Sequence, residues 1–227
     1  MSRQIWLVRH GQASWDQSNY DQLSALGYAQ CAALGESLTA TGRVPDRVVI
    51  GGLRRHRQSW DSMAETMGSN VAVTVDCGWD EYDHDDVLAR RYPELSDHSA
   101  MLEFANKQPD AAATFQRLHD DAAGRWAGAG SCDDYRESFP EFSSRVMAAL
   151  SRLSEARTAK TTLVITSGGP ISAVVSQLSV GGNDLWAEAL SRTLNASITT
   201  VVVNKSTLKL LSYNEHSHLP VRVVTSV

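Results

Sequence analysis

An apolar run over residues 5–8 ends abruptly in Arg9-His10-Gly11. A run of this length is typical of a buried strand, and open parallel sheets bind ligands beyond the carboxyl ends of their strands. Gly11 allows the backbone to turn sharply and to approach a ligand closely. Arg9 carries a planar fork of donors that suits phosphate, and His10 carries a ring nitrogen that is largely neutral near pH 7. Taken alone, the motif fits equally well a strand end with a surface arginine and a packed histidine, so its context along the chain is decisive.

Short apolar strands alternate with helical segments along the chain. The pattern predicts strands at 5–8, 47–50, 71–75, 162–166, 198–203 and 207–213, and helices at 25–41, 54–67, 140–157, 171–178 and 184–193. This alternation predicts an α/β fold, a three-layer α/β/α sandwich with a mostly parallel sheet. The junction at Asn204-Lys205 predicts one antiparallel strand at an edge.

The polar, helical stretch 87–130 is interrupted by Pro93 and Pro109 and has no Gly/Ser linker on either side. We therefore expect a single domain over residues 1–227 with a helical cap inserted at about 87–139.

Composition narrows the possible classes of protein. With 42% hydrophobic residues in 227 positions, the chain is able to bury a sizeable core. Its net charge of -5 argues against nucleic acid as a partner. The run 5–8 is too short for a signal peptide or a membrane span. Three scattered cysteines without CxxC spacing fit a reducing compartment and neither a disulfide framework nor a zinc site. We expect a cytoplasmic protein with neither nucleic acid nor membrane as a partner.

Three further stretches suit a phosphate site at strand ends. Arg54, Arg55 and Arg57 begin a helix, where free N–H groups and arginine forks favour anions, and an anion site is preferred here over the alternative of a solvated basic face. Glu81 lies among aromatic residues in the loop 76–86, a setting that can raise a carboxyl pKa enough for general acid catalysis, whereas most acidic loops are merely solvated. The segment 167–169, Ser-Gly-Gly, is a second glycine turn that opens a helix and lacks the spacing of a nucleophile elbow.

Together and in this order, these motifs resemble the histidine phosphatase superfamily, in its phosphoglycerate-mutase-like branch. Arg9-His10-Gly11 matches the signature of that family, residues 23–27 (Leu-Ser-Ala-Leu-Gly) with Gln30 resemble its helix start, and residues 53–59 resemble its second arginine motif. The likeness continues to Asn214 and His218-Leu219. It implies that His10 is the phosphorylated nucleophile, that Arg9 and Arg55 bind phosphate, that Glu81 donates the proton, and that no metal or cofactor is needed. Further phosphate-binding residues are expected at Gly11, Ser24, Ser167 and Gly168.

The departures from the family pattern are equally informative. The family has a second histidine after the fourth strand, where this chain has Ser167, and Gly51, His56 and Ser59-Trp60 also differ from the pattern. A missing preorganised donor costs about 3–4 kcal/mol in the transition state. His84 is our candidate replacement, on a loop where acidic neighbours would favour its protonated form, although an exposed histidine is an equal reading. We expect its ring to reach a phosphate bound between Arg9 and Arg55, and His84→Ala to lose about tenfold or more in kcat/KM.

The sequence thus predicts a cofactor-independent phosphomonoester hydrolase that forms a phosphohistidine with a small phosphorylated metabolite. Two alternatives stay open. A phosphoglycerate mutase ranks lower, because the cap has more acids than bases despite Arg90-Arg91 and lacks the cap motifs of the mutases. A non-catalytic binder of phosphorylated ligands would keep both arginines and have lost turnover with the second histidine. The sequence identifies neither the substrate nor the oligomeric state, and it leaves a homodimer open.

Overall fold

A computed structural model describes residues 2–14, 21–95, 98–128, 134–156, 159–180, 182–205 and 207–226. Within these residues, six strands form one sheet in the order β3-β2-β4-β1-β5-β6. The strands are β1 (Arg3–Arg9), β2 (Arg47–Ile50), β3 (Val73–Val75), β4 (Thr161–Thr166), β5 (Ile198–Asn204) and β6 (Thr207–Glu215). β4 pairs in parallel with β1 and β2, and β2 with β3, whereas β5 is antiparallel to β1 and β6. The predicted mostly parallel sheet is confirmed, and its one reversed strand, β5, lies next to the edge strand β6.

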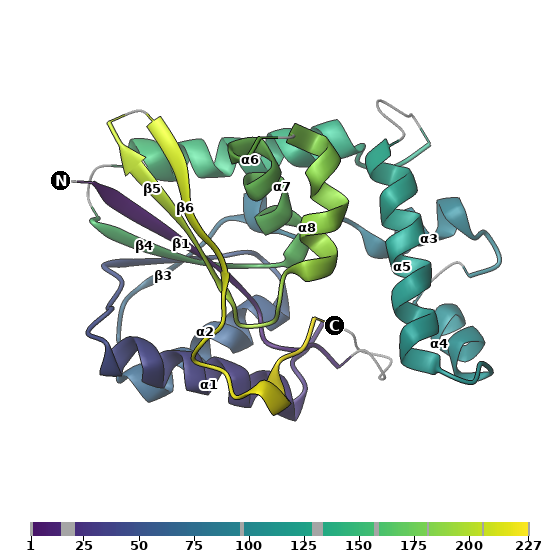
Figure 1. Cartoon of the computed structure of the whole chain (residues 1–227), viewed down its shortest axis with the longest axis horizontal. Helices are drawn as coiled ribbons and strands as arrows, with labels where there is room; N and C mark the ends of the chain where they lie inside the picture. The colour runs from purple at the N-terminus through teal and green to yellow at the C-terminus, as the bar shows by residue number, and fades with distance from the viewer. Residues whose placement is uncertain are drawn as a thin grey trace.

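Helices cover both faces of this sheet (Figure 1). One face carries α1 (Ala25–Ala40) and α2 (Arg54–Met67), and the other carries α6 (Phe139–Glu155), α7 (Gly168–Leu178) and α8 (Trp186–Arg192). Alternation along β1 sends Trp6 and Val8 into the core on the α1 and α2 side, and Ile5 and Leu7 into the core on the α6 and α7 side. The predicted three-layer architecture is therefore confirmed.

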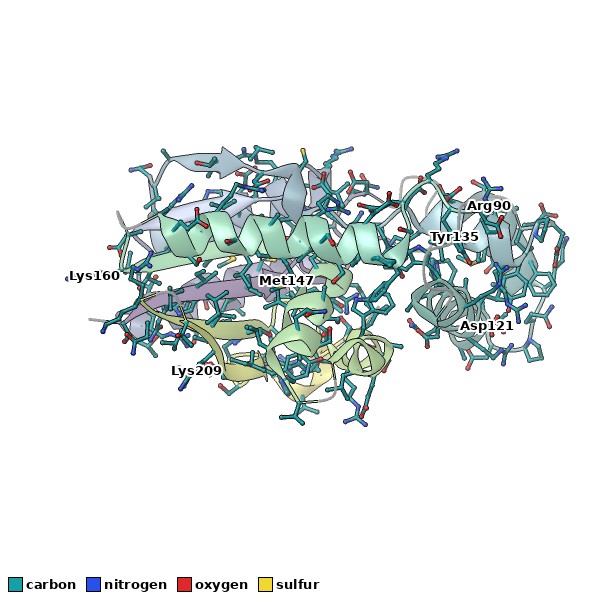
Figure 2. All side chains as sticks on the ribbon, turned by 90° about the horizontal axis from the view of Figure 1, so that it is seen from above. Arg90, Asp121, Tyr135, Met147, Lys160 and Lys209 are labelled. Carbon is teal, nitrogen blue, oxygen red and sulfur yellow. The ribbon has the colours of Figure 1, made fainter. Side chains whose placement is uncertain are left out.

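A third group of helices lies beyond one end of the sheet (Figure 1). It comprises α3 (His84–Arg91), α4 (His98–Asn106) and α5 (Ala111–Gly128), which we call the cap. Figure 2 shows Arg90, Asp121 and Tyr135 in this outlying part, whereas Met147 lies on α6 alongside the sheet. Arg91 and Tyr92 both donate to Asp121, at 2.6 Å each, and join α3 to α5.

Several element bounds differ from the sequence prediction. The helix expected from residue 87 begins at His84, because the Asp83 side chain accepts a hydrogen bond from Asp86 N and caps it. His84 therefore lies on a helix rather than in a loop. The helix expected from residue 140 begins at Phe139, after the capping box of Ser138 and Glu141. Short 3-10 turns occur at η1 (Cys77–Trp79), η2 (Gly182–Leu185) and η3 (Val221–Val223).

Two features bear on the expected class of protein. Among the described helices, none is both long enough and apolar enough to cross a membrane. Cys31 is buried and Cys77 is exposed, both as free thiols, and Cys132 lies outside the described residues.

Candidate active site

The predicted motifs meet at the carboxyl ends of three adjacent strands. β4 lies between β1 and β2, so the segments that follow these strands become neighbours. The backbone N–H of His10 donates to Thr166 O at 2.9 Å, and that of Gly51 donates to Ile165 O at 3.0 Å. This edge of the sheet is where an open α/β fold binds its ligand.

His10 is buried and held in one orientation. Its Nδ1 lies 2.7 Å from Gly11 O, which accepts only, so Nδ1 carries the proton. Its Nε2 then has a free lone pair, which accepts from Arg55 Nε at 3.2 Å. Burial lowers the pKa of His10 well below its usual value, and the charges of Arg55 and Arg9 lower it further. The ring is thus a neutral imidazole with Nε2 as its nucleophilic atom.

Gly11 allows the turn after His10 to pack against α1. A Cβ at this position would overlap the carbonyl oxygen of Gly27, so no larger residue fits without a shift of the backbone. The N–H of Gly11 donates to Ser59 Oγ at 3.1 Å. Ser24 caps α1, because its Oγ accepts from Gly27 N at 3.0 Å and donates to Gln12 at 2.9 Å. Gly11 and Ser24 therefore shape the turn that carries His10.

Arg55 is the one buried arginine of the three that begin α2. Arg54 and Arg57 are exposed, whereas Arg55 is only 4% exposed and points to His10. Its Nη1 forms a salt bridge of 3.0 Å with Asp21. Asp21 also accepts from the backbone N–H groups of Arg54, at 2.9 Å, and Arg55, at 3.4 Å. Asp21 thus binds both the guanidinium of Arg55 and the N–H groups at the start of α2, and so holds Arg55 in place.

Arg9 approaches the site from the end of β1. Its Nη1 donates to the carbonyl oxygens of Thr193 and, at 2.8 Å, of Ser226 near the end of the chain. Its guanidinium carbon lies 3.7 Å from the place where a Cβ of Gly168 would stand. Because Gly168, the first residue of α7, has no side chain, the guanidinium group of Arg9 is able to lie close to it.

Glu81 is tied to the start of α7. Its Oε2 accepts from Gly169 N at 3.0 Å, and its Oε1 accepts from Tyr82 N at 3.2 Å. Burial raises the pKa of Glu81, against the opposing effects of the Gly169 hydrogen bond and the Arg55 charge. A carboxyl group with a raised pKa beside a nucleophilic histidine is suited to general acid catalysis.

Ser167 lies at the end of β4 and is completely buried. Its Oγ lies 2.8 Å from Nε2 of His56, a second fully buried histidine. The ring of His56 stands 5.8 Å from that of His10, measured between centroids, with a tilt of 38°.

One pocket collects the five predicted catalytic residues. Among the described residues, its wall is formed from the strand-end side by Arg9, His10, Arg55, Glu81 and Tyr82, and from the cap side by His84, Phe115, Gln116, His119 and Asp120, with Leu190 and Ser226 beside them. The predicted phosphate-binding residues Gly11, Ser24, Ser167 and Gly168 are not among the described residues of this wall, and their role stays a prediction. The arrangement offers a neutral nucleophile, two cations and a proton donor around one space.

His84 faces the cap side of the pocket. Its ring centroid lies 4.2 Å from that of Tyr82 and 5.2 Å from that of His119. It therefore shares a pocket with His10, and its contact with a bound phosphate stays a prediction. Within the described part of the chain, no three His, Cys, Asp or Glu side chains group as a metal site.

A family model for branch 1 of the histidine phosphatase superfamily matches residues 5–216. The chain belongs to this superfamily. The match spans every strand of the sheet, together with the segments that carry Arg9, His10, Arg55, Glu81 and Ser167.

Relatives within the superfamily have two kinds of named activity. A metal-independent phosphoserine phosphatase from Arabidopsis thaliana is 25% identical over 222 residues, which are 95% of this chain and 83% of that protein. A probable phosphoglycerate mutase from Salmonella paratyphi C is 25% identical over 209 residues, which are 89% of this chain and 86% of that protein.

Solved structures of the superfamily share the fold. A phosphoserine phosphatase mutant from Entamoeba histolytica in complex with phosphoserine has a TM-score of 0.67 at 17% identity and covers 96% of this chain and 99% of its own. A mycobacterial glucosyl-3-phosphoglycerate phosphatase complexed with VO3 has a TM-score of 0.65 at 22% identity and covers 94% of this chain and 99% of its own.

Three contributions to the site were missed by the sequence analysis. Asp21 supports Arg55, His56 contacts Ser167, and residues of α5 such as His119 close the pocket from the cap side. The departure at His56 was visible as a histidine in place of a small residue, but not the direction of its ring. Nothing in the sequence around Asp21 or His119 distinguishes them from surface residues.

Proposed function

We propose that this protein is a phosphomonoester hydrolase that forms a phosphohistidine at His10 and acts on a small phosphorylated metabolite. The observation that carries the proposal is the setting of the His10 ring. Gly11 O holds Nδ1, which leaves the Nε2 lone pair directed at Arg55 inside the pocket that also contains Arg9 and Glu81. A neutral nucleophile between two cations matches the needs of phosphoryl transfer, which relies mainly on positioning and charge stabilisation.

The first half of the reaction transfers the phosphoryl group to the enzyme. Arg9 and Arg55 bind the phosphoryl oxygens, and Nε2 of His10 attacks phosphorus in line with the ester oxygen. A P–N bond forms while the P–O bond to the alcohol breaks. Protonated Glu81 gives its proton to the leaving alkoxide, so that a neutral alcohol departs.

The second half releases phosphate by the reverse use of the same groups. The Glu81 carboxylate takes a proton from a water molecule, whose oxygen attacks the phosphorus of phospho-His10. The P–N bond breaks, and its electron pair returns to Nε2. We expect no metal requirement, because the two arginines and the N–H groups at the start of α7 supply the positive field.

The cap favours the hydrolase over a phosphoglycerate mutase. The two arginines of α3 pair away from the pocket wall described above: Arg90 with Asp86, and Arg91 with Asp121. On the cap side, that wall contains Asp120, whose pKa burial raises. Among the described residues on the cap side of that wall, no arginine or lysine is present to pair with the free carboxylate of a phosphoglycerate. The cytoplasmic location and a homodimer stay predictions.

A substrate screen tests the proposal. The purified wild type and His10→Ala are compared on a wide panel of phosphomonoesters between pH 5 and 8, with phosphoserine and the phosphoglycerates included because of the activities named for the relatives. We expect turnover of at least one ester by the wild type and none by His10→Ala. Phosphoryl exchange between 2- and 3-phosphoglycerate would favour the mutase. A wild type that binds esters without hydrolysing any of them would instead support the non-catalytic binder.

A further inference from the structure

Three of the departures from the family pattern meet at one point of the structure. Gly51 follows β2, His56 lies in the first turns of α2, and Ser167 follows β4. Nε2 of His56 contacts Ser167 Oγ at 2.8 Å, and a Cβ on Gly51 would overlap Nδ1 of His56. The imidazole therefore fits because one neighbour has no side chain and the other has a short one. A longer residue at either position would exclude it.

The buried ring lies beside the nucleophile. The ring centroids of His56 and His10 are 5.8 Å apart, and no part of His56 reaches solvent. Arg55 faces this ring from the same helix, and His10 faces it from the end of β1. Burial, followed by the charge of Arg55, lowers the pKa of His56 well below its usual value. The ring of His56 is therefore neutral.

Ser167 connects this histidine to the residues that handle phosphate. It precedes the first turn of α7, and its side chain makes no capping hydrogen bond to that helix. The next residue, Gly168, lies against Arg9, and Gly169 donates to Glu81. The Ser167 hydroxyl is thus bound to an imidazole, and the two residues that follow Ser167 contact Arg9 and Glu81, which line the pocket.

We propose that His56 and Ser167 act together as one phosphoryl-stabilising unit, in which Ser167 contacts the phosphoryl group and His56 is a positioning residue that acts through it. This inference rests on the proposed function and deepens it. It gives the unit the position that a single histidine has in the family pattern. His84, on the cap side, then contributes separately to the pocket.

The unit works through one tautomer of the neutral ring. With its proton on Nε2, His56 donates to Ser167 Oγ. The hydroxyl proton of Ser167 is then directed to a phosphoryl oxygen. No proton is taken up or released, and the bond from the imidazole strengthens the hydroxyl as a donor.

A residue swap tests this inference. The variants are His56→Ala, Ser167→Ala, their double variant His56→Ala/Ser167→Ala, Ser167→His and the swap His56→Ala/Ser167→His, with Arg57→Ala as the matched control. Arg57 follows His56 on α2, is exposed and lies 4.0 Å from Asp61. For each protein, kcat and KM are measured with p-nitrophenyl phosphate, the dissociation constant is measured for orthovanadate, and thermal unfolding verifies the fold.

We expect His56→Ala and Ser167→Ala each to lower kcat by about tenfold or more, with a smaller change in KM. Their combined loss should be close to either single loss, because residues that act as a unit are not additive. Ser167→His alone should stay impaired, since His56 occupies the space. The double swap should recover about tenfold in kcat over His56→Ala, because it places one imidazole where the pair stood. Arg57→Ala should match the wild type.

Other results overturn the inference. A folded His56→Ala protein with wild-type kcat and vanadate affinity would show that the ring only fills space, as would additive losses. Should His56→Ala fail to fold, Ser167→Ala removes a single oxygen, and its unchanged kcat would refute the unit. Turnover that needs His10 but not His56 refutes this inference alone. A wild type without turnover refutes the proposed function, and unchanged vanadate affinity in His56→Ala would then refute the unit separately.

Discussion

At the scale of single residues, the site depends on which atom of His10 is free to react. The Gly11 carbonyl fixes the proton on Nδ1, and Arg55 contacts Nε2 without competing for a proton, because guanidinium only donates. Burial beside two arginines also keeps the ring neutral. Both effects come from residues next to His10 in sequence or in the second arginine motif, so these motifs were enough to single out His10 as the candidate nucleophile.

Arg55 should matter far more than the arginines on either side of it. Replacing Arg55 by Ala removes a buried donor that faces His10 and is expected to lower kcat/KM by about a hundredfold or more. Arg54→Ala and Arg57→Ala change exposed side chains and serve as controls, with an expected change of less than about threefold. Steady-state kinetics of the three variants distinguish a specific contact of Arg55 from a diffuse basic face. Equal losses in all three would indicate a diffuse basic face.

Glu81→Gln should affect substrates according to how much their leaving group needs a proton. The active form of the wild type carries a proton on Glu81, so kcat/KM should fall as the pH rises through the raised pKa of this carboxyl group. The amide of the variant has no acidic proton to donate, so we expect a loss of about a hundredfold with an alkyl phosphate such as phosphoserine and a smaller loss with p-nitrophenyl phosphate. The alkaline fall should also disappear. Equal losses with both esters would remove Glu81 from the role of proton donor.

At the scale of elements, the start of α7 organises the opposite side of the site. Its first two residues are glycines, and each has a charged side chain against it: Arg9 against Gly168 and Glu81 against Gly169. Thr166 Oγ1 donates to Trp79 O at 2.6 Å and fixes the loop that leads to Glu81 against the end of β4. The close approach of backbone and side chains explains why small residues occur here.

Gly169→Ala tests this close approach. A Cβ at this position would overlap Oε1 of Glu81, so the carboxyl group must move away from the place where it donates its proton. We expect kcat to fall by about tenfold or more with little change in KM. Gly124→Ala in α5 is the matched control, because its Cβ would meet nothing within 4 Å, and it should keep its activity with equal or higher thermal stability. Wild-type kcat in Gly169→Ala would show that the position of Glu81 is not critical.

The sequence predicted most elements because the central strands β1, β2 and β4 contain short apolar runs between turn residues. It placed the start of α3 three residues late, because the pattern did not reveal the Asp83 cap. It proposed His84 as the replacement for the missing second histidine, with Ser167 left open, because sequence proximity to Glu81 was the available guide, and this stays a prediction. The contact between His56 and Ser167 joins residues 111 positions apart and depends on the order of β2 and β4 in the sheet. Local patterns do not contain that order.

At the scale of the whole molecule, the cap and the strand ends form opposite sides of the pocket. The strand-end side supplies Arg9, His10, Arg55 and Glu81, whereas α5 supplies Gln116, His119 and Asp120 on the other side. The cap wall has no arginine or lysine among its described residues. Substrate choice therefore depends on residues whose position comes from the packing of α5, which is why the sequence motifs did not indicate the substrate.

His119→Ala should change substrate preference rather than the chemical step. We expect KM to rise by about tenfold for the ester that the screen ranks first, whose alcohol part must contact the cap. With p-nitrophenyl phosphate, the change should stay below about threefold in kcat. Glu103→Gln is the control and should match the wild type, because Glu103 is an exposed residue of α4 that forms a salt bridge with Lys107. A uniform loss with every substrate would place His119 in the chemistry instead.

Trapping the phosphoenzyme is the most direct test of the phosphohistidine proposed at His10. Wild type and His10→Ala are mixed with a ³²P-labelled substrate, quenched within the first turnover, and divided between acid and alkali before the protein-bound label is counted. A phosphohistidine at His10 predicts label on the wild type that is stable in alkali and lost in acid, and no label on His10→Ala. An acid-stable adduct would place the phosphoryl group on a hydroxyl such as that of Ser167. An acid-labile adduct that persists in His10→Ala would place it on another histidine. Either result would contradict a phosphohistidine at His10.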